Sequence, residues 1–263
     1  MTTNFKLLFL DIDGTTLRPN DTIENSTKEA VAAVQEKGVG VFLATGRPLH
    51  EISDIAKELN IDSFIGYNGA FALHNKKEII NAPMNEQAVQ FFMKTAKELG
   101  HEIVMYTDEK NVFTTLETEK IKQFIKTFHL RKNELYNPEV TSHILGMTLM
   151  NIKETELKQY ENEYNIHLSQ VNVEGMHDCY DVIRDNVNKG SAIQAVLKHL
   201  NVEKQSSIAF GDGMNDKEML TNVGESFAMG NAHPDLFAYA KHKTTSVTDS
   251  GIYNGLKVLG LLS

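Results

Sequence analysis

Short apolar runs alternate with amphipathic segments in the outer parts of the chain. The apolar runs, which are typical of strands buried on both faces, cover 7–10, 39–44, 64–65, 207–210 and 226–229. The segments with helical periodicity cover 26–36, 49–59, 189–200, 216–223 and 235–240. Strands and helices that alternate with short links predict an α/β fold built on a doubly wound, Rossmann-like parallel sheet.

Two local signals refine these elements. Ser26 is the predicted N-cap of the first helix, with Glu29 three residues later completing a capping box. Asn68-Gly69 follows the strand 64–65 and favours a tight turn, the alternative being a plain connector.

The middle of the chain has a different pattern, in which predicted strands are adjacent rather than separated by helices. We expect residues 1–82 and 186–263 to form one discontinuous core domain. Residues 83–185 would form an inserted α+β cap domain, and no chemical motif falls inside it. The alternative is a single continuous domain.

Composition and charge exclude several classes of protein. The chain has 263 residues with a net charge of −9, which argues against a general nucleic-acid binder. The single Cys179 excludes an intrachain disulfide framework, and we expect a buried structural thiol. No apolar run approaches the roughly 20 residues of a membrane span. We expect a cytoplasmic protein, with no feature that indicates an obligatory protein partner.

Two aspartates stand at the end of the first predicted strand, in Asp11-Ile12-Asp13-Gly14. Side chains two residues apart share one face of a strand, so both carboxylates should emerge together where open α/β sheets bind ligands. Like charges side by side cost free energy unless a cation or a shared proton relieves them. This pair therefore indicates function rather than packing.

Three further motifs should converge on the same edge of the sheet. They are 44–47 (Ala-Thr-Gly-Arg), 188–190 (Asn-Lys-Gly) and 211–216 (Gly-Asp-Gly-Met-Asn-Asp). Acidic oxygen clusters suit Mg²⁺, while threonine hydroxyls and backbone N–H groups bind phosphate oxygens. With a lysine added, these parts suit phosphoryl transfer, and a nucleophilic aspartate would give an aspartyl-phosphate.

In these four motifs the chain resembles the haloacid dehalogenase superfamily. More narrowly, it resembles the Cof-type sugar-phosphatase group, which carries a large α+β cap between the second and third motifs. The order, the spacing and the strand context of the motifs all match. The resemblance implies a Mg²⁺-dependent phosphatase of small phosphorylated metabolites, such as sugar phosphates or phosphorylated cofactors.

The resemblance also implies residue roles. Asp11 would be the nucleophile, and Asp13 the general acid and base. Mg²⁺ would be held by the Asp11 carboxylate, the Asp13 backbone carbonyl and the Asp212 carboxylate. Asp216 would lie next to these ligands and support them without contacting the metal directly. The phosphate and substrate contacts would come from Thr45, Gly46, Lys189 and Asn215, together with Arg47 and Asn68 on the cap side.

The segment before the lysine departs from the family pattern. The family commonly has a Glu and a Pro there, whereas this chain has Asp181, Arg184 and Asn186. The lysine itself is intact. We therefore expect hinge geometry and substrate contacts of this chain's own.

The sequence also allows alternatives for single residues and for the whole chain. The structural alternatives are that Asp13 is a turn carboxylate, Thr45 a strand end, Lys189 a solvated residue, Asp216 a first-turn helix carboxylate and Arg47 a surface cation. For the whole chain, the alternatives are a phosphomutase of the same superfamily and, from another class, a non-catalytic sensor of phosphorylated ligands.

Overall fold

The computed structural model describes residues 4–161 and 164–263, which form two compact units. The first unit contains Met1–Arg47, Ser53–Asn81 and Asn188–Ser263. The second contains Ala82–Val187 together with the short segment Pro48–Ile52. The domains expected from the sequence place 48–52 in the first unit instead, and their other boundaries lie within two residues of the observed ones.

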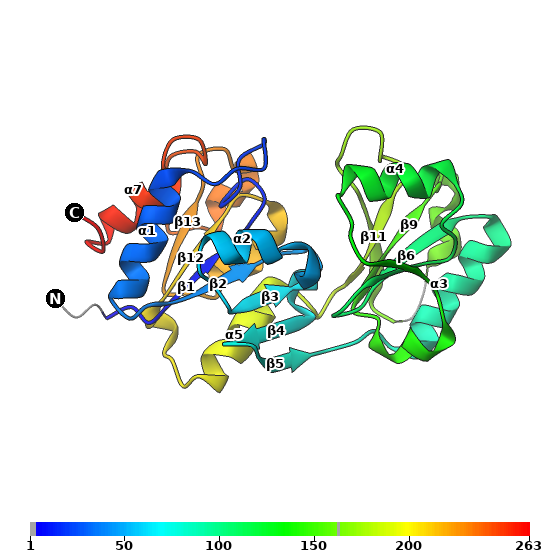
Figure 1. Ribbon diagram of the computed structural model, residues 1–263, viewed down its shortest axis with the longest axis horizontal. Coiled ribbons are helices and arrows are strands. Elements are labelled where there is room, and N and C mark those ends of the chain that lie inside the picture. Colours follow the sequence, from blue (N-terminus) through cyan, green and yellow to red (C-terminus); the bar gives the residue numbers. More distant parts are fainter. Residues whose placement is uncertain (1–3, 162–163) are drawn as a thin grey trace. The chain divides into compact units, whose positions relative to one another are not determined.

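The first unit is built on an eight-stranded sheet in the order β14-β13-β12-β1-β2-β3-β4-β5 (Figure 1). The pairs from β14 to β3 are parallel, and β4 and β5 extend the sheet as an antiparallel edge. The strands are β1 (Leu7–Leu10), β2 (Gly40–Ala44), β3 (Phe64–Gly66), β4 (Phe71–His74), β5 (Lys77–Asn81), β12 (Ser207–Gly211), β13 (Glu225–Ala228) and β14 (His242–Lys243). The predicted α/β fold with a parallel sheet is confirmed.

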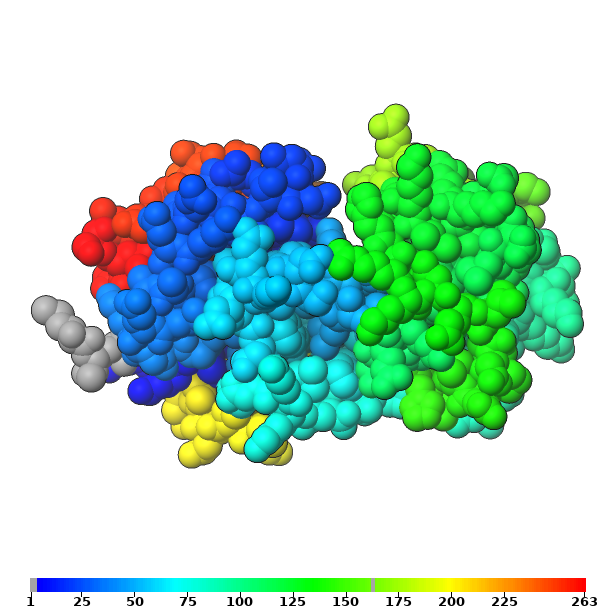
Figure 2. All heavy atoms as spheres, viewed as in Figure 1, coloured from blue at the N-terminus to red at the C-terminus, as the bar shows by residue number. Residues whose placement is uncertain are grey.

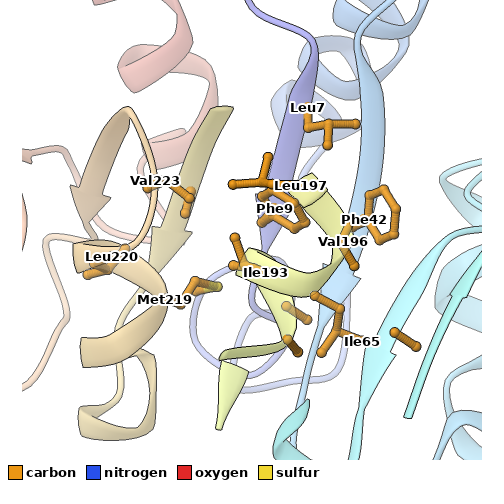
Figure 3. Packing of buried hydrophobic residues seen from close by; sticks show 14 of the residues in the cluster. Leu7, Phe9, Phe42, Ile65, Ile193, Val196, Leu197, Met219, Leu220 and Val223 are labelled. Atoms are coloured by element: carbon orange, nitrogen blue, oxygen red, sulfur yellow. The ribbon is translucent and has the colours of Figure 1, made fainter. Parts of the chain in front are cut away.

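Helices cover both faces of this sheet. They are α1 (Asn25–Glu36), α2 (Ser53–Glu58), α5 (Lys189–His199), α6 (Lys217–Thr221) and α7 (Gly251–Val258), with short 3-10 turns η2 (Tyr67–Gly69), η5 (Lys204–Ser206), η6 (Met214–Asp216) and η7 (Pro234–Ala238). On one face, Ile193 and Val196 of α5 and Met219 of α6 pack against Phe9 and Phe42 of the central strands (Figure 3). Burial of these apolar side chains fixes α5, and with it the first residue of that helix, against the sheet.

The opposite face is covered by α1 and α7, which contact each other. Gly255 of α7 lies so close to the sheet that an added Cβ would be 2.5 Å from the Phe210 ring. Phe210 and Phe227 stack beneath the helix with ring centroids 4.6 Å apart. Helices α1 and α7, which are far apart in the sequence, thus lie side by side in one unit, where blue and red segments meet in Figure 2.

The second unit contains a six-stranded sheet in the order β10-β11-β9-β6-β7-β8. Its strands are β6 (Glu102–Tyr106), β7 (Asn111–Phe113), β8 (Asn133–Leu135), β9 (Gly146–Met150), β10 (Ile166–Gln170) and β11 (Tyr180–Arg184). Its helices are α3 (Glu86–Leu99) and α4 (Glu119–Thr127), with 3-10 turns η1 (Leu49–Glu51), η3 (Pro138–His143) and η4 (Glu154–Tyr160). Most neighbouring strands are antiparallel, which gives the α+β character expected for this region.

The prediction of Ser26 as the first N-cap is wrong. Helix α1 begins at Asn25, and its N-cap is Glu24, whose side chain makes no cap hydrogen bond. Instead the Glu24 carboxylate accepts hydrogen bonds from the Ser26 hydroxyl at 3.2 Å and from the Ser250 backbone N–H at 3.0 Å. A long-range partner therefore determines the start of this helix.

The continuous helix predicted over 49–59 is also wrong. The segment divides into η1 and α2, with Ile52 between them. The Glu51 carboxylate is buried in the second unit, where it accepts hydrogen bonds from the Arg131 N–H at 2.7 Å and from Asn111 Nδ2 at 2.8 Å. The Glu51 side chain is thus held by donors that lie 60 and 80 residues away in the sequence.

Candidate active site

The carboxyl ends of three adjacent strands carry the predicted motifs. Asp11 directly follows β1, Thr45 directly follows β2 and Asp212 directly follows β12. Because β12, β1 and β2 are neighbours and parallel, these residues lie at one edge of the sheet. Lys189, the first residue of α5, is brought to the same edge by the packing of that helix.

The loop after β1 is held in place by hydrogen bonds of its own. The Thr16 hydroxyl donates to the Asp11 carbonyl at 2.6 Å, and the Leu17 N–H donates to the Ile12 carbonyl at 2.7 Å. Gly14 has a φ of +77°, and a Cβ there would lie 2.2 Å from Asp212 Oδ2. Only glycine satisfies both the left-handed backbone and this close approach.

Three carboxylates and one ammonium group form the centre of the site. Ligand oxygens of Asp11, Asp212 and Asp216 lie within 4.8 Å of one another. Lys189 Nζ donates to Asp11 Oδ1 at 2.5 Å and to Asp216 Oδ1 at 2.7 Å. The Lys189 side chain is 0% exposed, so the alternative of a solvated first-turn lysine does not describe it.

Asp216 holds the neighbouring loop as well as the lysine. Its Oδ2 accepts hydrogen bonds from the backbone N–H groups of Asp212 at 3.0 Å and Gly213 at 3.1 Å. Its Oδ1 receives Lys189, so both oxygens already have protein donors. This carboxylate therefore fixes the position of Asp212 and of the lysine rather than facing solvent.

Burial and mutual repulsion perturb the acidic groups. Burial, followed by the charge of Asp216, raises the pKa of Asp11 well above its ordinary value, although Lys189 acts in the opposite direction. The same two causes raise the pKa of Asp212 to about 6. Burial opposes the charge of Lys189, but Asp11 and Asp216 outweigh it and raise the pKa of the ammonium group.

The charge of this cluster fits a divalent cation. With all groups ionised, three carboxylates and one ammonium leave two negative charges in a buried site, which is the charge that one Mg²⁺ would neutralise. Oxygen-only donors are the set that Mg²⁺ prefers. The Asp13 carbonyl accepts no hydrogen bond from the described residues, so it is available as a further oxygen ligand.

A second group of donors lies at the end of β2. Thr45 is buried, and its Oγ1 accepts a hydrogen bond from the Arg47 N–H at 3.0 Å, which leaves the hydroxyl proton available. Among the residues that the structure describes, no acceptor faces the Gly46 N–H. A hydroxyl and a free backbone N–H side by side can bind an oxyanion.

The structure also places Arg47, Asn68 and Asn215 at this edge. Arg47 Nε and Nη2 donate to the two Asp13 carboxylate oxygens at 3.0 and 2.5 Å. Asn215 Nδ2 donates to Asn68 Oδ1 at 3.4 Å, and a Cβ on Gly46 would lie 3.1 Å from the Asn68 amide. All of the predicted site residues are thus gathered at the carboxyl edge of one sheet.

Two residues in contact with this cluster were not predicted from the sequence. The Thr15 hydroxyl donates to Asp212 Oδ1 at 3.0 Å. Asn231 Nδ2 donates to the Gly14 carbonyl at 2.8 Å and approaches Asp212 Oδ2 at 3.5 Å. Thr15 lies inside the first motif, so its hydroxyl could have been recognised. Asn231 lies in a loop with no pattern that would mark it.

A parallel α/β sheet with a carboxylate cluster, a buried lysine and a free hydroxyl and N–H at its carboxyl edge is an arrangement that suits phosphoryl transfer. The chain matches the haloacid dehalogenase-like hydrolase family over residues 8–256. It belongs to that family, and the resemblance found in the four motifs is confirmed.

Relatives and solved structures agree with this assignment. YkrA of Bacillus subtilis (strain 168), which carries a phosphatase name, is 32% identical over 98% of each chain. The HMP-PP phosphatase of Klebsiella pneumoniae (strain 342) is 27% identical over 90% of this chain and 88% of its own. The structure of the HAD subclass IIB sugar phosphatase BT4131 superposes with a TM-score of 0.82 at 26% identity, covering 98% of this chain and all of that chain. Within the described residues, no helix has both the length and the apolar character needed to cross a membrane.

Proposed function

We propose that this chain is a Mg²⁺-dependent phosphatase that hydrolyses small phosphorylated metabolites through an aspartyl-phosphate. Sugar phosphates and phosphorylated cofactors are the expected substrates. The observation that carries the proposal is the contact of Lys189 with Asp11 and Asp216 inside a buried acidic cluster. The phosphatase names of the relatives support the reaction, and the sugar phosphatase among the structural neighbours supports the substrate class.

The first half of the reaction transfers the phosphoryl group to Asp11. A carboxylate oxygen of Asp11 attacks phosphorus, and the bond between phosphorus and the leaving oxygen breaks. Asp13 gives its proton to that leaving oxygen, so the leaving group departs as an alcohol. Lys189 keeps the Asp11 side chain in one orientation and offsets phosphoryl charge, while Thr45 and the Gly46 N–H bind the non-bridging oxygens.

The second half returns Asp11 to its starting state. Asp13, now a carboxylate, takes a proton from a water molecule that attacks the phosphorus of the aspartyl-phosphate. The bond between phosphorus and Asp11 breaks, and inorganic phosphate leaves. Mg²⁺, held by the carboxylates of Asp11 and Asp212 and the Asp13 carbonyl, would supply positive charge beside the phosphoryl oxygens.

Arg47 bears on the role of Asp13. In this structure both Asp13 oxygens accept hydrogen bonds from the Arg47 guanidinium. An acid that gives a proton to a leaving oxygen needs one of its own oxygens free of such a donor. We therefore infer that Arg47 moves off at least one Asp13 oxygen when a substrate binds.

The test is release of inorganic phosphate from a panel of sugar phosphates, nucleotides, pyridoxal phosphate and an aryl phosphate, with and without Mg²⁺. Asp11→Asn keeps the side-chain shape and removes the nucleophile, so its turnover should fall by at least about 10³-fold. Asp235→Asn, a change of the same kind at a side chain that is 77% exposed, is the matched control and should keep wild-type turnover. Full turnover by Asp11→Asn would overturn the proposal.

Adding a sugar bisphosphate to the panel, and measuring phosphorylated protein, separates the two rival functions. A phosphomutase would need a bisphosphate activator and would return the phosphoryl group to a sugar hydroxyl instead of water. A sensor would accumulate a stable acyl-phosphate on Asp11 without turnover.

A further inference from the structure

The loop after β13 brings one more polar side chain, Asn231, to the carboxyl edge of the sheet in the first unit. Strand β13 is the neighbour of β12, and Asn231 lies three residues beyond its end. The Met229 N–H donates to the Gly211 carbonyl at 3.0 Å, and the His233 N–H donates to the Asp212 carbonyl at 2.9 Å. These two hydrogen bonds hold the backbone on either side of Asn231 against the loop that carries Asp212.

The orientation of the Asn231 amide follows from its partners. The Val247 N–H donates to Asn231 Oδ1 at 2.8 Å. A backbone N–H can only donate, so the atom that faces Val247 must be the amide oxygen, and Nδ2 points the other way. There Nδ2 donates to the Gly14 carbonyl at 2.8 Å and to Asp212 Oδ2 at 3.5 Å. The two protons of the amide nitrogen thus meet two acceptors, one on each of two loops of the acidic centre.

The contact with Gly14 also bears on the Asp13 carbonyl. The Gly14 N–H donates to the Leu17 carbonyl at 3.0 Å, while the Gly14 carbonyl accepts from Asn231. The peptide bond between Asp13 and Gly14 is trans, so the Asp13 carbonyl points opposite to the Gly14 N–H. With both polar groups of Gly14 held, the direction of the Asp13 carbonyl is fixed as well.

The Asp212 carboxylate is held at both of its oxygens. Oδ1 accepts the Thr15 hydroxyl at 3.0 Å, and Oδ2 faces Asn231. The loop after β1 approaches so closely that a Cβ on Gly14 would lie 2.2 Å from Oδ2. Each carboxylate oxygen can accept more than one partner, so this arrangement limits rotation of the carboxylate and still leaves it able to bind a cation.

Packing alone does not account for the Asn231 side chain. Asn231 is exposed, so burial of its surface contributes little to stability, yet its oxygen and both of its amide protons have partners. A residue that served only to hold the loop around Val247 would need the Oδ1 contact and nothing more. The Nδ2 contacts lead instead to Gly14 and Asp212.

We propose that Asn231 is a positioning residue for the divalent cation. By joining Gly14 to Asp212, its amide fixes the spacing between the Asp13 carbonyl and the Asp212 carboxylate, and so strengthens Mg²⁺ binding. The inference rests on the proposed function, because it requires these two groups to hold Mg²⁺. Asn231 acts through them and not as a ligand, since its oxygen already accepts a hydrogen bond and an amide nitrogen does not bind Mg²⁺.

The test is the dissociation constant for Mg²⁺, obtained from the rise in Tm with Mg²⁺ concentration. A ligand that binds only the folded state raises the Tm according to its affinity, so this readout does not depend on turnover. Removing groups that orient metal ligands typically weakens metal binding by about 10- to 100-fold. Asn231→Ala should therefore raise the dissociation constant at least about tenfold, and phosphate release should require correspondingly more Mg²⁺.

The matched control is Asn254→Ala. Asn254 Nδ2 donates to Thr245 Oγ1 at 2.9 Å and to the Asp249 carbonyl at 3.2 Å, so it holds the same loop to which Val247 belongs. Among the residues that the structure describes, none of the acidic centre bonds to its side chain. This variant should lower the Tm in EDTA and keep the dissociation constant for Mg²⁺ within about twofold of wild type.

The outcomes separate this inference from the proposed function. An unchanged dissociation constant in Asn231→Ala, even with a lower Tm in EDTA, would mean that Asn231 only holds the loop, and would overturn the inference alone. An equal rise in Asn254→Ala would also overturn it, because the loop and not the amide would then control the site. A wild-type Tm that does not respond to Mg²⁺ would overturn the Mg²⁺ dependence of the proposed function, and the inference with it.

Discussion

The acidic centre should cost the protein stability whenever no divalent cation is present. Asp212 shows this most directly, because burial and the charge of Asp216 raise its pKa from an ordinary 3.8 to about 6. A carboxyl whose pKa is raised on folding is ionised at a loss of free energy. Replacing it with the neutral, nearly isosteric Asn should therefore stabilise the metal-free protein.

The size of this effect follows from the change in pKa. A rise from 3.8 to about 6 corresponds to about 3 kcal/mol at 1.36 kcal/mol per pKa unit. The pKa of about 6 already includes the hydrogen bond from Thr15 to Asp212 Oδ1, so about 3 kcal/mol is the upper value, reached only if the amide packs without loss. We expect Asp212→Asn to raise the free energy of unfolding by about 2 kcal/mol at pH 7, or the Tm by about 5 °C.

The pH dependence has a definite sign. Between pH 3.8 and about 6 the folded protein holds a proton on Asp212 that the unfolded chain releases. The contribution of Asp212 is therefore neutral below pH 3.8, becomes steadily destabilising as the pH rises through this window, and is complete above about pH 6. The advantage of Asp212→Asn over wild type should vanish near pH 4 and be greatest at pH 7.

The assay is thermal unfolding in EDTA and in excess Mg²⁺, at several pH values, for wild type, Asp212→Asn and the surface control Asp235→Asn. Mg²⁺ should stabilise the wild type and should do much less for Asp212→Asn, because a ligand that binds only the folded state adds to its stability. A Tm for Asp212→Asn below that of wild type in EDTA at pH 7 would refute the reasoning.

Changes at three other residues have testable effects on stability, activity or chemical reactivity. Lys189→Met leaves buried carboxylates without their counter-charge and should lower the free energy of unfolding by about 3–5 kcal/mol, measured by denaturant titration. Gly14→Ala places a Cβ on the Asp212 carboxylate at a left-handed φ and should abolish phosphate release while costing at least about 1–2 kcal/mol; wild-type kinetics would contradict this. Cys179 is buried with its pKa raised to about 12, so iodoacetamide at pH 8 should modify it only after unfolding, as followed by mass spectrometry.

The residues at the strand ends could be predicted because the signals for them are local. Parallel strands that are covered on both faces are apolar along their whole length, so β1, β2 and β12 are visible in the sequence. Asp11, Thr45 and Asp212 follow these runs directly. One rule of α/β topology then brings them to a common edge without any knowledge of tertiary contacts.

The edge of the sheet in the first unit was not predictable in the same way. Strands β4 and β5 are antiparallel, and β5 is largely exposed. Strands with partial burial lack the continuous apolar run that marks β1, and the Asn68-Gly69 signal before them indicated only a turn. Asn231 could not be predicted either. Its hydrogen bond to Gly14 joins residues 217 positions apart, and such a contact produces no local pattern in the sequence.

Glu51 shows most clearly where local pattern fails. The periodicity over 49–59 is helical, and nothing near Glu51 in the sequence distinguishes it from a solvated helix residue. Burial alone would raise its pKa, yet hydrogen bonds from His50, the Arg131 N–H and Asn111 outweigh burial and lower it. Two of these partners are 60 and 80 residues away, and both donate to Oε1, so this oxygen finds its partners within the second unit. Because an unpaired buried carboxylate is far more costly than a broken helix, the distant donors override the local propensity, and residues 48–52 leave the unit to which their neighbours on both sides belong.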